Sequence, residues 1–174
     1  LIVLLGKSTK LFNKFVGFDK AYKATLILGT KTLSSDIEGE VIEKKPYEHI
    51  SEKNIKEVLK KFEGDIKQIP PMVSAVKHKG KKLYELARKG INVERKARDI
   101  RIDKIEIESI DLPNVEIYIE CSKGTYVRQI AEDIGNELGC GACISQIERV
   151  KVGPFNIDES VVIEELDESN IRNW

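Results

Sequence analysis

Cysteine is scarce in this 174-residue sequence, and its three cysteines are an odd number. That count argues against a disulfide framework and for a reducing compartment. Two of them form the pair Cys140-Gly-Ala-Cys143, but a zinc site needs four ligands, and the two histidines, His49 and His78, lie far away in the sequence. A redox CxxC usually opens a helix, whereas this pair follows a helix end expected at Gly139. A metal or redox protein is therefore a weak alternative, and small residues packed in a tight turn are the simpler explanation.

Long apolar runs are also missing. No stretch approaches the ~20 apolar residues that span a membrane. The run LIVLL at positions 1–5 has neither the basic region nor the small-residue cleavage site of a signal peptide. With 41% hydrophobic residues, the chain is long enough to bury the core of one domain. We therefore expect a cytoplasmic protein without membrane association, and a monomer.

An initiating methionine is absent, because the chain begins with Leu1. Its first five residues are apolar and predict a buried strand with no segment leading into it. Since a fold seldom begins in its own core, we expect a fragment, a processed product or the ordered remainder of a longer polypeptide.

Net charge is zero, because 29 basic residues balance 29 acidic ones, but the charges are segregated. Residues 77–101 hold ten Lys or Arg against three Asp or Glu, a net of +7, and residues 1–31 carry +5. Residues 102–120 and 155–174 each carry −5. This separation favours a basic face that meets a polyanion such as nucleic acid, and an unevenly charged solvated surface is the alternative.

Hydrophobic periodicity predicts a short series of strands and helices. Strands are expected at 22–29, 73–77, 99–109, 114–121 and 144–152, and helices at 7–16, 51–62, 81–90, 127–138 and 160–166. The helix at 51–62 has Ser51 as its N-cap and Gly64 as its C′ residue. The alternating runs 99–109 and 114–121 predict an antiparallel pair, with one register shift in the first run. Because strands and helices do not alternate regularly, the expected fold class is α+β, with a mostly antiparallel mixed sheet flanked by helices.

A permanent cation stands in the first turn of the helix expected at 127–138. Arg128 lies where unpaired backbone N–H groups already make the helix end positive. One explanation is an i,i+4 pair with Glu132, which is worth a few tenths of a kcal/mol. The other is a carboxylate that comes from elsewhere in the fold.

Four stretches occur in an order that resembles one enzyme family. They are FDKAYKATLILGTKTLSSDIEGEV (18–41), IPPMVSAVKHKGKKLYELARKG (69–90), CSKGTYVRQIAEDIGNELGCGA (121–142) and ISQIERVKVGPF (144–155). Together they are similar to the bacterial tRNA pseudouridine-55 synthases, the TruB family. SKGTYVR followed by LGCGA is the most specific part, and the resemblance covers residues 1 to about 155.

The resemblance implies a fold, an activity and a partner. The fold would be a pseudouridine synthase catalytic domain, here at 1–157, with a basic insertion at about 69–98 that clamps RNA, and an acidic segment at 158–174. The family isomerises a uridine in the T-arm of tRNA to pseudouridine and needs no metal or cofactor. The target base must be flipped out of the folded RNA, which costs a few kcal/mol that stacking and hydrogen bonds recover.

The resemblance also implies roles for individual residues. Arg128 matches the arginine that pairs with the catalytic aspartate, and a fixed cation keeps such a carboxylate ionised. Tyr22 and Tyr126 match positions at the uracil, with Tyr22 on the catalytic side, although ordinary core tyrosines are the structural alternative. Ile147 matches an apolar residue that closes the pocket, and Asp36 and Lys10 match polar positions near the cleft. The clamp would bind phosphates through five cations: Lys77, Lys79, Lys81, Lys82 and Arg88.

One expected residue has no counterpart. The family carries its nucleophilic aspartate in a GTLDP…GVL motif, which would lie a few residues before Leu1, and Asp19, Asp36, Asp65 and Asp133 stand in no such motif. We therefore expect this chain alone to be inactive, although its parent polypeptide would be an isomerase. The alternative is a non-catalytic RNA-binding module that retains the uracil pocket and the basic clamp.

Overall fold

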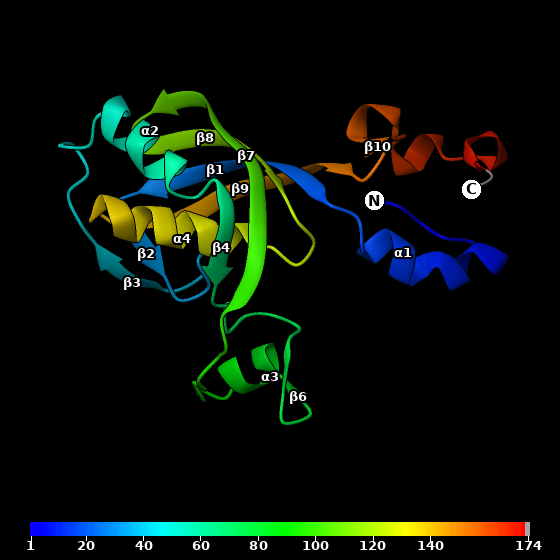
Figure 1. Ribbon diagram of the computed structural model, residues 1–174, viewed down its shortest axis with the longest axis horizontal. Helices are drawn as coiled ribbons and strands as arrows, with labels where there is room; N and C mark the ends of the chain where they lie inside the picture. The colour runs from blue at the N-terminus through cyan, green and yellow to red at the C-terminus, as the bar shows by residue number, and fades with distance from the viewer. Residues whose placement is uncertain (173–174) are drawn as a thin grey trace.

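A six-stranded antiparallel sheet with two helices on one face forms the body of the protein, in a computed structural model that describes residues 1–172 (Figure 1). The strand order is β10-β9-β1-β8-β7-β4. The strands span Lys20–Leu28 (β1), Gly64–Gln68 (β4), Arg98–Asp111 (β7), Asn114–Cys121 (β8), Ala142–Val152 (β9) and Phe155–Asn156 (β10). The helices α2 (Glu52–Lys60) and α4 (Val127–Leu138) pack on the sheet and share one hydrophobic core with it. The predicted α+β class is confirmed.

Alternation of isoleucines builds the long hairpin at the centre of the sheet. Strands β7 and β8 pair antiparallel, as the two alternating runs predict, and Ile100, Ile102 and Ile105 are buried. The register shifts twice, whereas the sequence predicted one shift: one shift lies between Ile107 and Ser109. The other lies between Ile102 and Lys104, where the alternation of the sequence also shifts. An extra residue at that point returns the next isoleucine to the core face.

Helix α4 has the bounds that its periodicity predicts, and its buried side chains are Val127, Ile130, Ala131, Ile134 and Leu138. It lies very close to β9, because a Cβ atom added at Gly135 would meet the Ala142 backbone nitrogen at 2.1 Å. At its end, Gly139 adopts φ +80°, a left-handed conformation that glycine takes at little cost. The absence of a side chain at Gly135 thus lets α4 pack closely against the start of β9.

Helix α2 begins as predicted but ends earlier. The Ser51 hydroxyl accepts a hydrogen bond from the Asn54 backbone N–H at 3.2 Å, and the Asn54 side chain accepts one from the Ser51 N–H at 2.9 Å. The helix ends at Lys60, and Gly64, predicted as the C′ residue, instead begins β4 with φ +91°. The turn between them holds Phe62 in the core.

Two predicted strands do not form. Residues 1–5 have no regular structure in the described chain, and the Leu1 side chain is 98% exposed. An apolar run becomes a strand only where a neighbour pairs with it, and no described strand does so. Residues 73–77 also lack a strand except at Lys77, because the Ser74 and Val76 carbonyls accept hydrogen bonds from Tyr84 and Leu83 at the start of α3 (Leu83–Ala87).

Three predicted helices are shorter than the sequence suggested. Residues 6–16 form a 3-10 helix, η1 (Gly6–Leu11), followed by α1 (Phe12–Val16). The helix expected at 81–90 is α3 alone, with Gly90 beyond its end. Up to residue 172, the acidic segment and the residue before it hold three single 3-10 turns, η2 (Ile157–Glu159), η3 (Ile163–Glu165) and η4 (Glu168–Asn170). Like charges and β-branched residues in a run this short do not sustain an α-helix.

The insertion projects from the body beyond β4 and β7 (Figure 1). It consists of a two-stranded hairpin, β5 (Lys77–His78) with β6 (Lys81–Lys82), and helix α3. Lys79 (φ +48°) and Gly80 (φ +84°) form the turn of the hairpin. A second small pair, β2 (Thr30–Thr32) with β3 (Val41–Lys44), brackets the turn-rich segment 33–40. None of the helices among the described residues has the length and apolar character needed to cross a membrane.

Candidate functional site

Arg128 is paired with a carboxylate from a distant part of the chain. Its Nη1 atom lies 2.6 Å from Oδ2 of Asp36, which precedes it by 92 residues. Glu132 is held instead by Lys31 at 3.2 Å and by the Ser35 hydroxyl at 2.5 Å. The i,i+4 explanation for Arg128 is therefore wrong, because its partner is Asp36, a carboxylate from elsewhere in the fold. The pairing with the catalytic aspartate that the resemblance implies stays a prediction.

The Asp36 carboxylate is fixed by its own loop. Ser34 Oγ donates to Asp36 Oδ1 at 2.7 Å, and Thr32 Oγ1 donates to the Asp36 carbonyl at 2.7 Å. Hydrogen bonds from Ile37 N to Ile144 O (2.8 Å) and from Ile144 N to Ser35 O (3.0 Å) tie the loop to β9. Burial acts to raise the pKa of Asp36, but the hydrogen bonds from Ser34 and Arg128 and the charge of Arg128 outweigh it and lower the pKa. The carboxylate is thus ionised at neutral pH and aimed at Arg128.

Tyr126 is the N-cap residue of α4, and a buried glutamine holds its backbone. Gln68 Nε2 donates to the Tyr126 carbonyl at 3.1 Å, and the Tyr126 N–H donates to Gln68 Oε1 at 2.8 Å. Five residues after Gln68, the Val73 carbonyl accepts a hydrogen bond from Arg128 Nη2 at 3.4 Å. The segment that leads out of β4 thus contacts both residues at the start of α4. Gln68 was not predicted as a site residue, and its place directly before the apolar stretch Ile69-Pro70-Pro71 was the only signal in the sequence.

Tyr22 and Ile147 lie on neighbouring strands. Tyr22 of β1 pairs in register with Arg149 of β9, and Ile147 pairs with Ala24. Tyr22 is half-buried and packs on the core, and burial is the main reason that its pKa is raised, while the neighbouring Arg149 opposes the shift. The Ile147 side chain is 47% exposed. Since directly paired residues point to one face, both side chains lie on the same face of the sheet as the buried Ala24.

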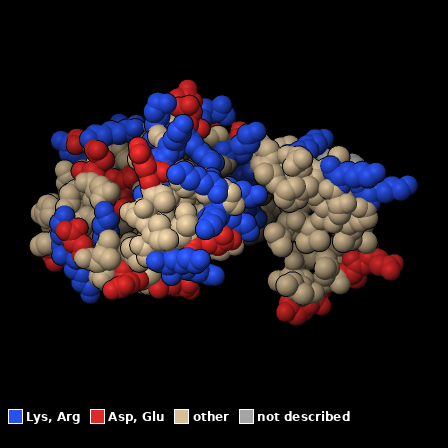
Figure 2. All heavy atoms as spheres, turned by 90° about the horizontal axis from the view of Figure 1, so that it is seen from below, with Lys and Arg blue, Asp and Glu red and all other residues tan. Residues whose placement is uncertain are grey.

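The remaining predicted residues lie apart from this group. Lys10 is exposed in η1, and no hydrogen bond or ion pair among the described residues joins it to Arg128 or Asp36. On the insertion, the Lys82 ammonium and the Arg88 guanidinium each lie 5.4 Å from the ring centre of Tyr84. Figure 2 views the molecule from the side from which the insertion projects, with Lys and Arg side chains over the centre of that face and acidic ones beside them.

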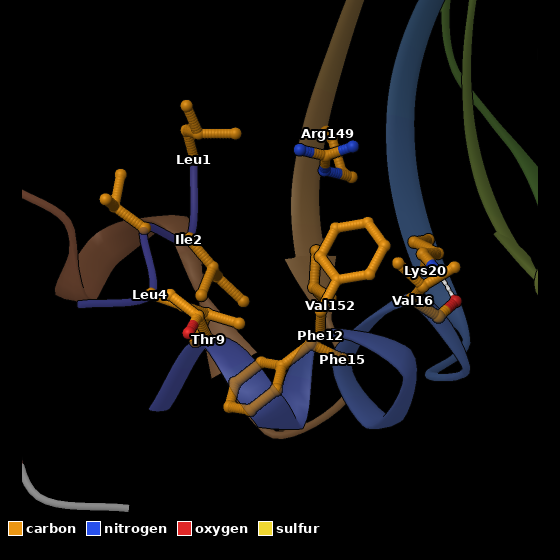
Figure 3. A pocket seen from close by; sticks show the side chains of 11 residues that line it. Leu1, Ile2, Leu4, Thr9, Phe12, Phe15, Val16, Lys20, Arg149 and Val152 are labelled. Atoms are coloured by element: carbon orange, nitrogen blue, oxygen red, sulfur yellow. Dashed lines mark hydrogen bonds between the residues drawn. The ribbon is translucent and has the colours of Figure 1, made fainter. Parts of the chain in front are cut away.

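A cavity of about 760 Å³ lies outside the group formed by Arg128, Asp36, Tyr126 and Tyr22 (Figure 3). It is formed by the N-terminal segment against the ends of β1 and β9, with Phe12 and Phe15 among its apolar lining and Lys20 and Arg149 as its cations. The lining includes neither Arg128 nor Asp36. The cavity is therefore separate from the candidate site.

The cysteines form no metal site in the described part of the chain. Cys121, Cys140 and Cys143 are buried and unbridged, and burial raises the pKa of Cys121 to about 11. Within residues 1–172, no group of three or more His, Cys, Asp or Glu residues is arranged to hold a metal ion. A thiol with so high a pKa is a poor nucleophile at neutral pH.

Comparison with known proteins decides the family. The model of the TruB family pseudouridylate synthase N-terminal domain matches residues 1–127, and that of the tRNA pseudouridylate synthase B C-terminal domain matches residues 128–173. The chain belongs to the TruB family. Pseudouridine synthases are isomerases of RNA uridines, so the resemblance seen in the sequence is confirmed at the level of the family.

The curated relatives are longer than this chain. It is 46% identical over 170 residues to the tRNA pseudouridine synthase B of Endomicrobium trichonymphae, covering 98% of this chain and 74% of the relative. It is 45% identical over 174 residues to that of Clostridium tetani (strain Massachusetts / E88), covering 100% of this chain and 60% of the relative. Among solved structures, the Cbf5 chain of a Cbf5-Nop10-Gar1 complex superposes with a TM-score of 0.69 at 28% identity, over 93% of this chain and 39% of that one.

Proposed function

We propose that this chain forms the substrate-binding part of a tRNA pseudouridine synthase that isomerises uridine 55 in the T-arm. The observation that carries the proposal is the Arg128–Asp36 pair at the start of α4, with Arg128 in the segment SKGTYVR that carries the resemblance to the family. We propose further that the nucleophilic aspartate lies in residues that precede Leu1, so that the 174 residues alone bind the substrate without converting it.

The proposed reaction needs a carboxylate that is ionised and aimed. Isomerisation breaks the bond between N1 of the base and C1′ of the ribose, turns the base and joins C5 to C1′. The C5 proton is released to solvent, and N1, freed from the sugar, takes up a proton. A guanidinium presents several donors in a fixed plane, and Arg128 uses Nη1 for Asp36 and Nη2 for the Val73 carbonyl. Held from two sides, it is a preorganised cation against which the incoming aspartate would stay ionised.

In the proposed reaction, the two tyrosines would contact the flipped base. A uracil extruded from the T-arm would stack on the Tyr126 ring, with Tyr22 beside it on β1 and Ile147 excluding water from the pocket. The insertion, about residues 69–98, would hold the phosphates of the arm through its lysines and Arg88. The catalytic domain would span 1–157, with 158–174 as an acidic segment beyond it.

Release of tritium from tRNA labelled at C5 of uridine tests this function. The 174-residue chain should bind the tRNA and release no tritium. Preceding Leu1 with the corresponding segment of the Clostridium tetani relative, which is 45% identical over the whole chain, should restore release. If the extended protein binds tRNA but releases none, the chain is a non-catalytic RNA-binding module and the enzymatic proposal fails.

A further inference from the structure

Gln68 is a buried polar side chain at the end of β4. It is the last residue of β4 and only 2% exposed, and both ends of its amide are satisfied by the backbone of Tyr126, 58 residues away. A buried amide that is fully paired with one distant residue defines the position of that residue, because any displacement would leave two polar groups without partners.

The start of α4 depends on this contact. The Tyr126 carbonyl also accepts from the N–H groups of Gln129 (3.0 Å) and Ile130 (3.1 Å), which form the first turn of the helix. The Tyr126 N–H, however, points out of the helix and reaches Gln68. No side chain caps the helix at Tyr126 itself. Gln68 therefore fixes the residue that joins the loop to the helix, and with it the direction of the Tyr126 ring.

The same segment also reaches Arg128 and continues into the insertion. After Gln68 the chain passes through Pro70-Pro71, whose φ angles are restricted, to the Val73 carbonyl that accepts from Arg128. Both contacts to α4 thus arise from a stiff stretch of six residues at the root of the insertion. Tyr126 and Arg128 are therefore held by one short segment, the end of β4 and the loop that follows it.

We propose that Gln68 is the positioning residue that sets Tyr126 for the flipped uracil, an inference that rests on the proposed function. Gln68 acts through Tyr126 and touches no reacting atom. Its loss should reduce the fraction of complexes in which the base is flipped and leave the affinity for the RNA nearly unchanged, because phosphate contacts supply most of that affinity. A purely structural role would lower stability and leave the flipped fraction of folded complexes as it was.

The test uses the 174-residue chain and a T-arm stem-loop RNA with 2-aminopurine beside the target uridine, whose fluorescence rises when the neighbouring base leaves the stack. Gln68→Met keeps the length of the side chain and removes both hydrogen bonds, while Gln68→Glu keeps the acceptor for the Tyr126 N–H. Gln129→Met is the matched control, since the Gln129 side chain donates to Asp133 on the same helix, at 2.9 Å, and the backbone bond to Tyr126 is kept. Circular dichroism and urea midpoints identify the folded variants, and hydrogen exchange reports on the Tyr126 amide.

For Gln68→Met we expect the flipping equilibrium to fall about tenfold, the cost of leaving a buried polar group unpaired. The dissociation constant should stay within about threefold of wild type, since the phosphate contacts are untouched. The Tyr126 amide should exchange faster, Gln68→Glu should lie between wild type and Gln68→Met, and Gln129→Met should match wild type. If Gln68→Met does not fold, the flipping equilibrium of Gln68→Glu tests the proposal instead: a value below wild type supports the role of Gln68, and a value equal to wild type overturns it.

Two failures are distinguishable. If the wild-type chain itself produces no rise in fluorescence, the proposed function fails and the role of Gln68 fails with it. If the wild type flips the base and both folded Gln68 variants flip it equally well, the proposed function stands and the role of Gln68 alone is overturned.

Discussion

At the scale of single residues, the site depends on the geometry of one guanidinium. Arg128 bonds to Asp36 and to the Val73 carbonyl through different nitrogen atoms, which a lysine ammonium cannot reproduce from one position. In the extended protein that tests the proposed function, Arg128→Lys should slow tritium release on the order of a hundredfold, as the loss of a preorganised donor does elsewhere. The dissociation constant for tRNA should stay within a few-fold. Single-turnover rates and filter binding measure the two quantities.

A matched control for Arg128→Lys is available on the sheet. Arg101 also donates through two nitrogen atoms, here both to one carboxylate, with Nε 2.7 Å and Nη2 3.3 Å from the Asp103 oxygens, but it is exposed and lies on β7. Arg101→Lys should leave the rate nearly unchanged. Equal losses in both variants would show that any paired arginine matters to folding, and would contradict a specific role for Arg128.

Asp36 gives a pH-dependent prediction. Its pKa in the folded chain is lowered from the ordinary 3.8, so its contribution to stability is present above that value and is lost as pH falls through the lower folded pKa. Asp36→Asn should therefore lower the urea midpoint by a constant amount at neutral pH, and the difference from wild type should shrink below about pH 4. Asp158→Asn, in the exposed turn η2, is the control. A difference that persists unchanged at low pH would exclude ionised Asp36 as its source.

At the scale of elements, hydrophobic periodicity predicted the helices and strands whose formation depends on residues within the element itself. Helix α4 and the β7–β8 pair follow from buried side chains that recur within the element, down to one of the two register shifts in β7. The strands predicted at 1–5 and 73–77 failed because strand formation depends on a partner that a single segment does not encode. Arg128 and Asp36 were each identified separately, but their pairing across 92 residues required the fold. Gln68 was missed for the same reason, since its partner lies 58 residues away.

The contact of α4 with β9 leads to a prediction about packing. A methyl group at Gly135 would meet backbone atoms, Ala142 N at 2.1 Å and Gly141 C at 2.3 Å, which cannot rotate away. Gly135→Ala should therefore lower the free energy of unfolding by about 1–3 kcal/mol or more, despite the better helix propensity of alanine. Asn136→Ala, one residue further on the exposed side, should change it by no more than about 0.5 kcal/mol. Urea titrations of both variants compare the two sites, and a Gly135→Ala variant as stable as wild type would rule out this close approach.

At the scale of the whole molecule, positive and negative charges sum to zero but lie in separate parts of the chain. The chain has no net charge, yet residues 77–101 concentrate the cations, and residues 102–120 and 155–174 are acidic. A protein with zero net charge has no overall attraction for a polyanion, so RNA binding must come from local fields that act within a Debye length of about 8 Å at physiological salt. The salt dependence of RNA binding should therefore come from a few lysines that contact phosphates.

The hairpin of the insertion should account for that salt dependence. Lys77, Lys79 and Lys81 are exposed around its turn. Replacing all three by alanine should reduce the slope of log affinity against log salt by about 0.7–0.9 for each phosphate contact that is lost. Lys53, Lys56 and Lys60 are exposed on α2, away from the insertion, and the same triple replacement there removes equal charge. Titrations of a T-arm stem-loop at several salt concentrations compare the two. If binding followed net charge alone, both triple variants would lose the same slope, whereas a local clamp loses it only in the hairpin.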